Sequence, residues 1–128
     1  MGWVFLRQEE VLKIHARMIE LFGGSEGIRD EGALASALLA AENRRHYENA
    51  DLAACAATDA YHLTQAHAFV DGNKRVAAAV TEVFLEINQA HLEATNRLWT
   101  CLWVWRASSR REIEELFRSW IADASSQL

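Results

Sequence analysis

The chain places several chemically active side chains close together in residues 67–75, which read HAFVDGNKR. This stretch supplies an imidazole at His67, a carboxylate at Asp71 and adjacent cations at Lys74 and Arg75. An imidazole changes charge near neutral pH and can accept a proton from a hydroxyl group. Ammonium and guanidinium groups bind phosphate oxygens. The spacing therefore predicts a site that holds an anion beside a proton acceptor.

The expected secondary structure puts this stretch at the start of a helix. Helical spacing of apolar and small residues predicts one helix that ends near Ala66 and another that starts near Asn73. The first N–H groups of a helix lack internal acceptors and carry partial positive charge. Gly72 has no side chain at the point where an anion would approach the backbone. We therefore expect the phosphates of a nucleotide to be bound by Gly72, Asn73, Lys74 and Arg75.

Asp71 lies directly before this expected phosphate site. A carboxylate beside polyphosphate is repelled unless a cation lies between them, and Mg²⁺ takes one or two protein carboxylates together with phosphate oxygens. We expect Asp71 to hold Mg²⁺, although the same side chain could cap the following helix instead or as well. His67 would act as the base, and Phe69 would point into the core. Base, metal ligand and phosphate cradle together predict a phosphate-transfer site.

Composition limits the other functions that are open to the chain. It has 128 residues, enough for one domain with a core, and a formal net charge of −5 at pH 7. A helix-turn-helix DNA-binding protein would fit the helices but not this charge, because phosphate backbones need a basic face. The sequence shows no signal peptide and no apolar run of the ~18 residues that a membrane span needs. Cys55 and Cys101 are expected to be reduced thiols, which indicates a cytoplasmic protein.

The elements that must position the site are helices. The chain lacks proline, and its apolar residues recur at helical spacing, so we predict one compact all-α domain over residues 1–128 with about six helices. The expected helices cover residues 9–22, 31–44, 52–66, 73–88, 93–106 and 109–123. We expect Asp30, Asp51 and Ser109 to cap the second, third and sixth of these helices. An N-terminal segment, 1–7, and a frayed tail, 124–128, would flank them.

The remaining histidines and the tryptophans receive simpler interpretations. His15 lies beside the apolar stripe of the first expected helix, which favours a hydrogen-bonded structural histidine. We assign no role to His46, His62 and His91. Tryptophan side chains could stack on a base, but core packing or partner contact is the favoured interpretation for Trp99, Trp103 and Trp105.

The stretch at 67–75 resembles the signature of the Fic/Doc superfamily, H-x-F-x-[D/E]-G-N-[G/K]-R. The resemblance covers about residues 5–121 and includes EEVLKIH, GGSEGIRDEG and SALLAAENR. It implies a Fic/Doc helical bundle with a short flap before the central helices, at Arg45–Asp51, which would dock the target chain through backbone pairing. It also implies ATP and Mg²⁺ as cofactors, with His67 as the base and Asp71 as the metal ligand.

Two positions resemble the death-on-curing, or Doc, branch of this superfamily. Lys74 stands where AMP-transferring members have glycine, and Ala78 stands where they carry a second arginine. The Doc resemblance implies a kinase that transfers the γ-phosphate of ATP to a threonine of translation elongation factor Tu and arrests translation. An AMP transferase of the same superfamily remains an alternative. A second alternative is a catalytically silent binding module that keeps the fold.

The resemblance also bears on regulation. Many Fic proteins carry an inhibitory helix of the form [S/T]-x-x-x-E-[G/N], and no Glu-Gly or Glu-Asn pair in this sequence completes it. The residues four positions before those glutamates are Phe22, Gly27, Leu38 and Arg44. The Doc resemblance therefore implies a toxin whose Phd-type antitoxin supplies an inhibitory helix in trans.

Overall fold

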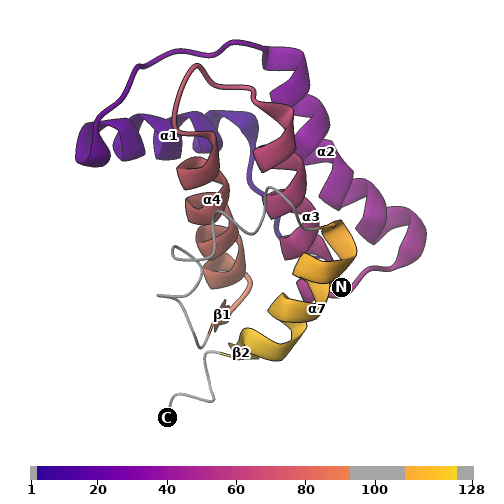
Figure 1. Ribbon diagram of the computed structural model, residues 1–128. Helices are drawn as coiled ribbons and strands as arrows, with labels where there is room; N and C mark the ends of the chain where they lie inside the picture. The colour runs from indigo at the N-terminus through magenta and orange to yellow at the C-terminus, as the bar shows by residue number, and fades with distance from the viewer. Residues whose placement is uncertain (1–2, 93–108, 124–128) are drawn as a thin grey trace.

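A computed structural model describes residues 3–92 and 109–123. This part of the chain contains the helices α1 (Gln8–Phe22), α2 (Glu31–Glu48), α3 (Leu52–Ala66), α4 (Asn73–Ile87) and α7 (Arg110–Trp120), and the short strands β1 (Ala90–Leu92) and β2 (Ile121–Asp123) (Figure 1). The predicted all-α architecture is confirmed. The helix expected at 93–106 lies outside the described residues, as do the three tryptophans at 99, 103 and 105, Cys101, and the expected tail at 124–128.

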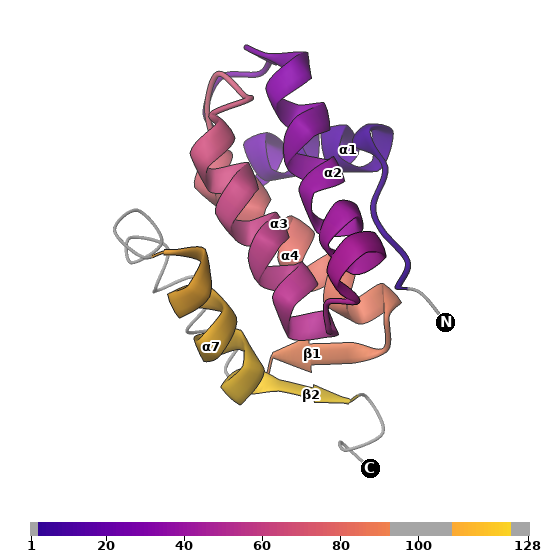
Figure 2. The same cartoon turned by 90° about the vertical axis from the view of Figure 1, so that its right-hand side faces the viewer.

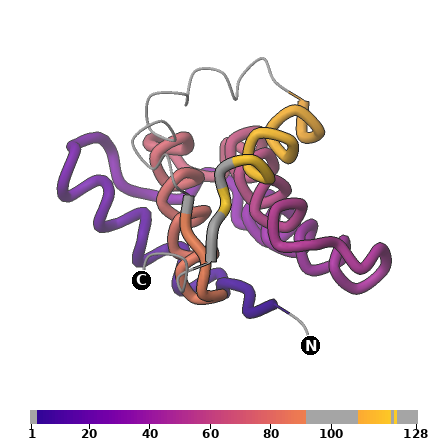
Figure 3. The backbone as a smooth tube through the Cα atoms, turned by 90° about the horizontal axis from the view of Figure 1, so that it is seen from below, coloured from indigo at the N-terminus to yellow at the C-terminus, as the bar shows by residue number. Residues whose placement is uncertain are grey.

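The helix α3 occupies the centre of the molecule and packs against α2, α4 and α7. The chain runs down α2, up α3 and down α4, while α1 crosses beside α4 near the upper end (Figures 1 and 2). Seen from below, α1 and α7 flank the α3–α4 pair on different sides (Figure 3). The strands β1 and β2 pair antiparallel, with Ala90 opposite Asp123, at the lower end.

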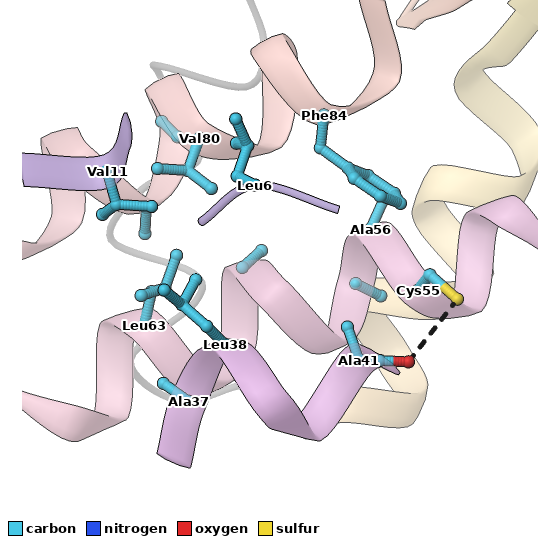
Figure 4. Packing of buried hydrophobic residues seen from close by; sticks show 14 of the residues in the cluster. Leu6, Val11, Ala37, Leu38, Ala41, Cys55, Ala56, Leu63, Val80 and Phe84 are labelled. Atoms are coloured by element: carbon cyan, nitrogen blue, oxygen red, sulfur yellow. Dashed lines mark hydrogen bonds between the residues drawn. The ribbon is translucent and has the colours of Figure 1, made fainter. Parts of the chain in front are cut away.

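Small residues make the central position of α3 possible. Its alanines between Ala53 and Ala60 are almost completely buried, so neighbouring helices can approach its backbone closely. Larger apolar side chains from the surrounding elements fill the space between helices (Figure 4). The largest fully buried ones include Phe69, Phe84, Phe117, Leu34 and Leu63. None of the helices in the described ranges is long and apolar enough to span a membrane.

The predicted end of the second helix, and the flap expected after it, are wrong. Polar residues at 45–48 continue α2, because side chains such as Arg44 bond within the helix (Nε to Glu48 Oε2, 3.0 Å) and Asn49 then ends it with a left-handed backbone. Asp51 caps the start of α3, whereas His67 follows its last residue. Residues 45–51 therefore lie at the opposite end of α3 from the motif.

The last helix also ends earlier than expected. Ser109 caps it as the sequence predicts, accepting a hydrogen bond from Glu112 N at 3.2 Å. The helix stops at Trp120, and the following residues enter β2 instead of completing another turn. This pairing joins segments about 30 residues apart in the sequence. A local sequence pattern cannot predict such a long-range contact.

Candidate active site

The motif loop between α3 and α4 is held against the loop between α1 and α2. Ala68 O accepts hydrogen bonds from Arg29 N at 2.7 Å and from Asp30 N at 3.0 Å, and Val70 N donates to Gly27 O at 3.1 Å. These bonds form a short antiparallel bridge around Phe69. The two loops meet at the upper end of the bundle in Figure 1. A pairing of distant segments therefore fixes the path of the motif.

Phe69 anchors the motif from inside. Its ring is 1% exposed, which confirms the prediction that it points into the core. Its backbone N–H donates to Asn73 Oδ1 at 3.0 Å, and its carbonyl accepts from Asn73 Nδ2 at 2.9 Å. Both polar groups of the Asn73 side chain thus shape the loop. The backbone N–H of Asn73, at the first position of α4, is the group that an anion can use.

The predicted site residues surround one cavity of about 500 Å³. It opens beside the motif loop and the first turn of α4. Its lining comprises Thr64, Gln65, His67, Val70, Asp71, Gly72, Asn73, Lys74 and Arg75. The structure therefore brings together the six residues that the sequence assigned to base, metal and phosphate functions. Their individual roles remain predictions.

His67 lies at the end of α3 with its side chain exposed to this cavity. Its backbone adopts φ 48° and ψ 42°, in the left-handed region. Such a conformation costs free energy for any residue with a Cβ atom, and histidine is among the types found there more often. The surrounding pairing maintains this conformation and turns the chain sharply into the motif. The imidazole is consequently placed at the rim of the cavity by the fold.

The first turn of α4 forms the cationic wall of the cavity. Gly72 precedes it with φ 76°, and a Cβ atom there would lie 3.3 Å from Ile19 Cδ1. Lys74 and Arg75 follow within the first turn, where a cation is unfavourable for the helix dipole. A bound anion would reverse that penalty. The guanidinium of Arg75 lies 5.1 Å from the centre of the Phe22 ring, which holds it beside the cavity.

Asp71 is fixed by backbone donors from both loops. Its Oδ1 accepts from Gly72 N at 2.8 Å and its Oδ2 from Ser25 N at 3.2 Å. The Asp71 carboxylate lies so close to the backbone of Gly24 that a Cβ atom on Gly24 would be 2.7 Å from Asp71 Oδ2. Sequence reasoning missed Gly24 and Ser25 as parts of the site. The Gly23–Gly24 pair was a signal that the backbone there is unusual.

The donor set around Asp71 fits Mg²⁺. The carboxylate is exposed and retains lone pairs beyond the two that accept N–H groups. No group of three or more His, Cys, Asp or Glu side chains suited to a metal occurs in residues 3–92 and 109–123. A cation here would rely on one side-chain carboxylate, phosphate oxygens and water, which is the coordination that Mg²⁺ prefers.

Comparison with known proteins identifies the family. Residues 5–85, more than half of the chain, match the model of the Fic/DOC family, and this range includes the whole motif loop. This chain belongs to the Fic/DOC family. Members of the Fic/DOC family are typically transferases that act on proteins, and they generally bind ATP with Mg²⁺. A comparison with curated proteins found no match.

The other described histidines of this Fic/DOC protein lie outside the cavity. His15 is 5% exposed and hydrogen-bonded, as predicted. Burial lowers the pKa of His62, and the nearby cations of Arg110 and Arg44 lower it further. These positions leave His67 as the histidine at the cavity among the residues that the structure describes.

Proposed function

We propose that this Fic/DOC protein is a Doc-type protein kinase that transfers the γ-phosphoryl group of ATP to a hydroxyl of a protein substrate. The observation that carries the proposal is the convergence of His67, Asp71 and the start of α4 on one cavity. A base, a carboxylate for a divalent cation and a cationic helix terminus are the parts that phosphoryl transfer needs.

The proposed reaction gives each of these groups one role. His67 accepts the proton of the substrate hydroxyl, and the resulting oxygen attacks the γ-phosphorus. The bond from that phosphorus to the β–γ bridging oxygen breaks, and ADP leaves with the electron pair. Lys74, Arg75 and the first N–H groups of α4 bind the phosphate oxygens and stabilise their charge. Asp71 would hold Mg²⁺, which would neutralise further phosphate charge.

Two residues favour phosphate transfer over AMP transfer. The Lys74 side chain contributes to the cavity wall, where AMP-transferring relatives have glycine, and it would change how a triphosphate lies. Ala78, at the position of their second arginine, is 0% exposed in the core. A methyl group at this position supplies no cation, and its burial leaves no space there for a guanidinium. In the alternative reaction the hydroxyl would attack the α-phosphorus and release pyrophosphate.

The expected substrate and regulator complete the proposal. The substrate is a threonine of elongation factor Tu or a similar translation protein, so the reaction would arrest translation. Regulation comes from a Phd-type antitoxin that inserts an inhibitory helix at the exposed cavity in trans. The sequence supports this arrangement because its Glu-Gly and Glu-Asn pairs do not complete an inhibitory motif in cis.

The test uses two isotopic labels. Purified protein is incubated with Mg²⁺, a cell lysate or purified elongation factor Tu, and ATP labelled at either the γ- or the α-phosphate. We expect label on protein from γ-labelled ATP alone, and none with the His67→Asn variant. Label from α-labelled ATP would establish AMP transfer instead. Absence of label from both, with growth arrest that His67→Asn does not relieve, would support the silent binding module.

A further inference from the structure

The buried His15 of α1 contacts the backbone of the motif loop. Its Nε2 lies 2.8 Å from the backbone oxygen of Asp71, across 56 positions of sequence. A carbonyl oxygen only accepts, so Nε2 carries the proton and donates. His15 does not contribute to the cavity lining. Its contact is therefore with the backbone of the motif and not with a ligand in the cavity.

A second contact fixes the plane of the His15 ring. The imidazole stacks on the Phe69 ring, with centroids 3.9 Å apart and an interplanar angle of 11°. Phe69 is itself clamped through its backbone to Asn73. The donor direction of His15 is consequently determined by the same residue that anchors the loop. Stacking and hydrogen bond together hold both halves of the turn, at Phe69 and at Asp71.

The carbonyl that His15 holds belongs to the peptide that joins Asp71 to Gly72. The orientation of this peptide sets the direction of the Gly72 N–H, which donates to Asp71 Oδ1 at 2.8 Å. It also sets the left-handed backbone of Gly72, at φ 76°, from which α4 starts. An unpaired Asp71 carbonyl would be partly buried, and the loop would rotate to solvate it.

We infer that His15 is a positioning residue for the phosphate-binding turn: it acts through the Asp71 carbonyl to set the carboxylate and the start of α4. The inference rests on the proposed function and deepens it, since it divides the work between two histidines. His67 would exchange a proton at the cavity, while His15 keeps its proton on Nε2 and orients the backbone.

Two substitutions separate the hydrogen bond from the packing. His15→Phe keeps a ring to stack on Phe69 but has no donor. His15→Gln places an N–H donor near the position of Nε2 but has no ring. We expect His15→Phe to raise the KM for Mg·ATP about tenfold or more, as the loss of one buried hydrogen bond implies, with kcat within about threefold. His15→Gln should stay within about threefold of the wild type in KM.

Amide hydrogen exchange tests the same inference without activity. We expect His15→Phe to accelerate exchange at Phe69 N–H and Gly72 N–H about tenfold, with His15→Gln close to the wild type and the core amides of α3 unchanged in both. Equal exchange in His15→Phe and the wild type overturns the inference, whatever the kinetics. Equal acceleration in both variants also overturns it, because packing alone would then explain the effect. A wild-type protein that transfers no label refutes the proposed function, while the exchange comparison still decides the role of His15.

Discussion

His67 combines an exposed side chain with a left-handed backbone, at φ 48°. Any replacement that tests its chemistry must therefore tolerate this backbone. Alanine would add conformational strain to the loss of the imidazole, and the two effects would be mixed. Asparagine adopts the left-handed region more readily than other non-glycine residues. It is therefore the cleaner substitution at this position.

We expect His67→Asn to lower kcat by about 10²–10⁴-fold, since it removes a general base. The affinity for Mg·ATP should stay within a few-fold of the wild type, because Lys74, Arg75 and the start of α4 are unchanged. Initial rates and calorimetric nucleotide titration measure the two quantities. A variant with wild-type kcat would exclude His67 as the base.

The Gly23–Gly24 pair offers a matched test of the Asp71 position. Both glycines have positive φ, 82° and 117°, so alanine is strained at either one. A Cβ atom at Gly23 meets nothing within 4 Å, whereas one at Gly24 would lie 2.7 Å from Asp71 Oδ2. Gly24→Ala and Gly23→Ala should each cost about 1 kcal/mol or more of stability. We expect Gly24→Ala alone to weaken Mg²⁺-dependent ATP binding, measured by titration with and without Mg²⁺. Equal binding by the two variants would argue against a metal role for Asp71.

At the scale of elements, a cluster of charges docks α7 on the bundle. Arg44 of α2 donates from Nη1 to Thr58 Oγ1 of α3 at 2.9 Å and to Glu114 Oε2 of α7 at 3.2 Å. Burial lowers the pKa of the Arg44 guanidinium, but its bonds to Glu48 and Glu114 outweigh this and raise it overall. The side chains of Arg44 and Glu114 are only 18% and 17% exposed, so their attraction is weakly screened by water.

We expect Glu114→Gln to lower the free energy of unfolding by about 1–3 kcal/mol, because Arg44 would lose a charged partner in a partly buried place. Glu115→Gln is the control, since Glu115 is the exposed next residue of the same helix, and it should change stability by less than about 0.5 kcal/mol. Urea unfolding of both variants gives the comparison. A Glu114→Gln protein as stable as the control would show that the Arg44–Glu114 ion pair is not needed to dock α7.

At the scale of the whole molecule, stability should depend on pH through two carboxyl groups whose pKa values are shifted in opposite directions by folding. Burial raises the pKa of Asp59 well above its usual value, and the nearby charge of Glu42 adds to this. Burial also raises the pKa of Asp51, but the N–H of Ala54 and the cation of Arg118 lower it more, so its net shift is downward. The folded state thus favours the proton at Asp59 and disfavours it at Asp51.

The raised pKa of Asp59 predicts that Asp59→Asn increases the stability of the protein at neutral pH. The unfolded chain loses this proton near pH 3.8, while the folded chain keeps it, so wild-type stability falls as pH rises toward the folded pKa of Asp59. We expect Asp59→Asn to be more stable than the wild type by about 1–3 kcal/mol at pH 7, with the difference vanishing near pH 4. Asp51→Asn should show the opposite trend, with a deficit at pH 7 that disappears as pH falls through the lowered pKa. Thermal unfolding across this pH range measures both, and a constant difference for Asp59→Asn would refute the first.

Local signals predicted most of the fold. Apolar spacing gave the helices, and the N-caps at Asp30, Asp51 and Ser109 are confirmed by hydrogen bonds from the third helical N–H of α2, α3 and α7. The end of α2 was missed because polar residues at 45–48 suit an exposed helix as well as a loop. The end of this helix is determined by side-chain hydrogen bonds such as Arg44–Glu48 and by the left-handed backbone of Asn49.

The motif loop was predictable for the same reason, since its residues lie within nine positions of one another. The residues that support it were not. Ser25 and His15 reach Asp71 across 46 and 56 positions, and no local period records such contacts. His15 was recognised as a hydrogen-bonded residue, but its partner is determined only by the crossing of α1 beside α4.

The burial of Cys55 has a practical consequence for spectroscopy of this protein. Its thiol is 0% exposed among helices α2 and α3, and burial raises its pKa to about 12. We therefore expect the Cys55 thiol not to react with maleimide reagents in the native protein. In a Cys101→Ser background, a cysteine introduced at Val70, which is 52% exposed at the cavity, would carry a single fluorescent dye. Arrival and departure of a nucleotide could then be followed in real time from one known point.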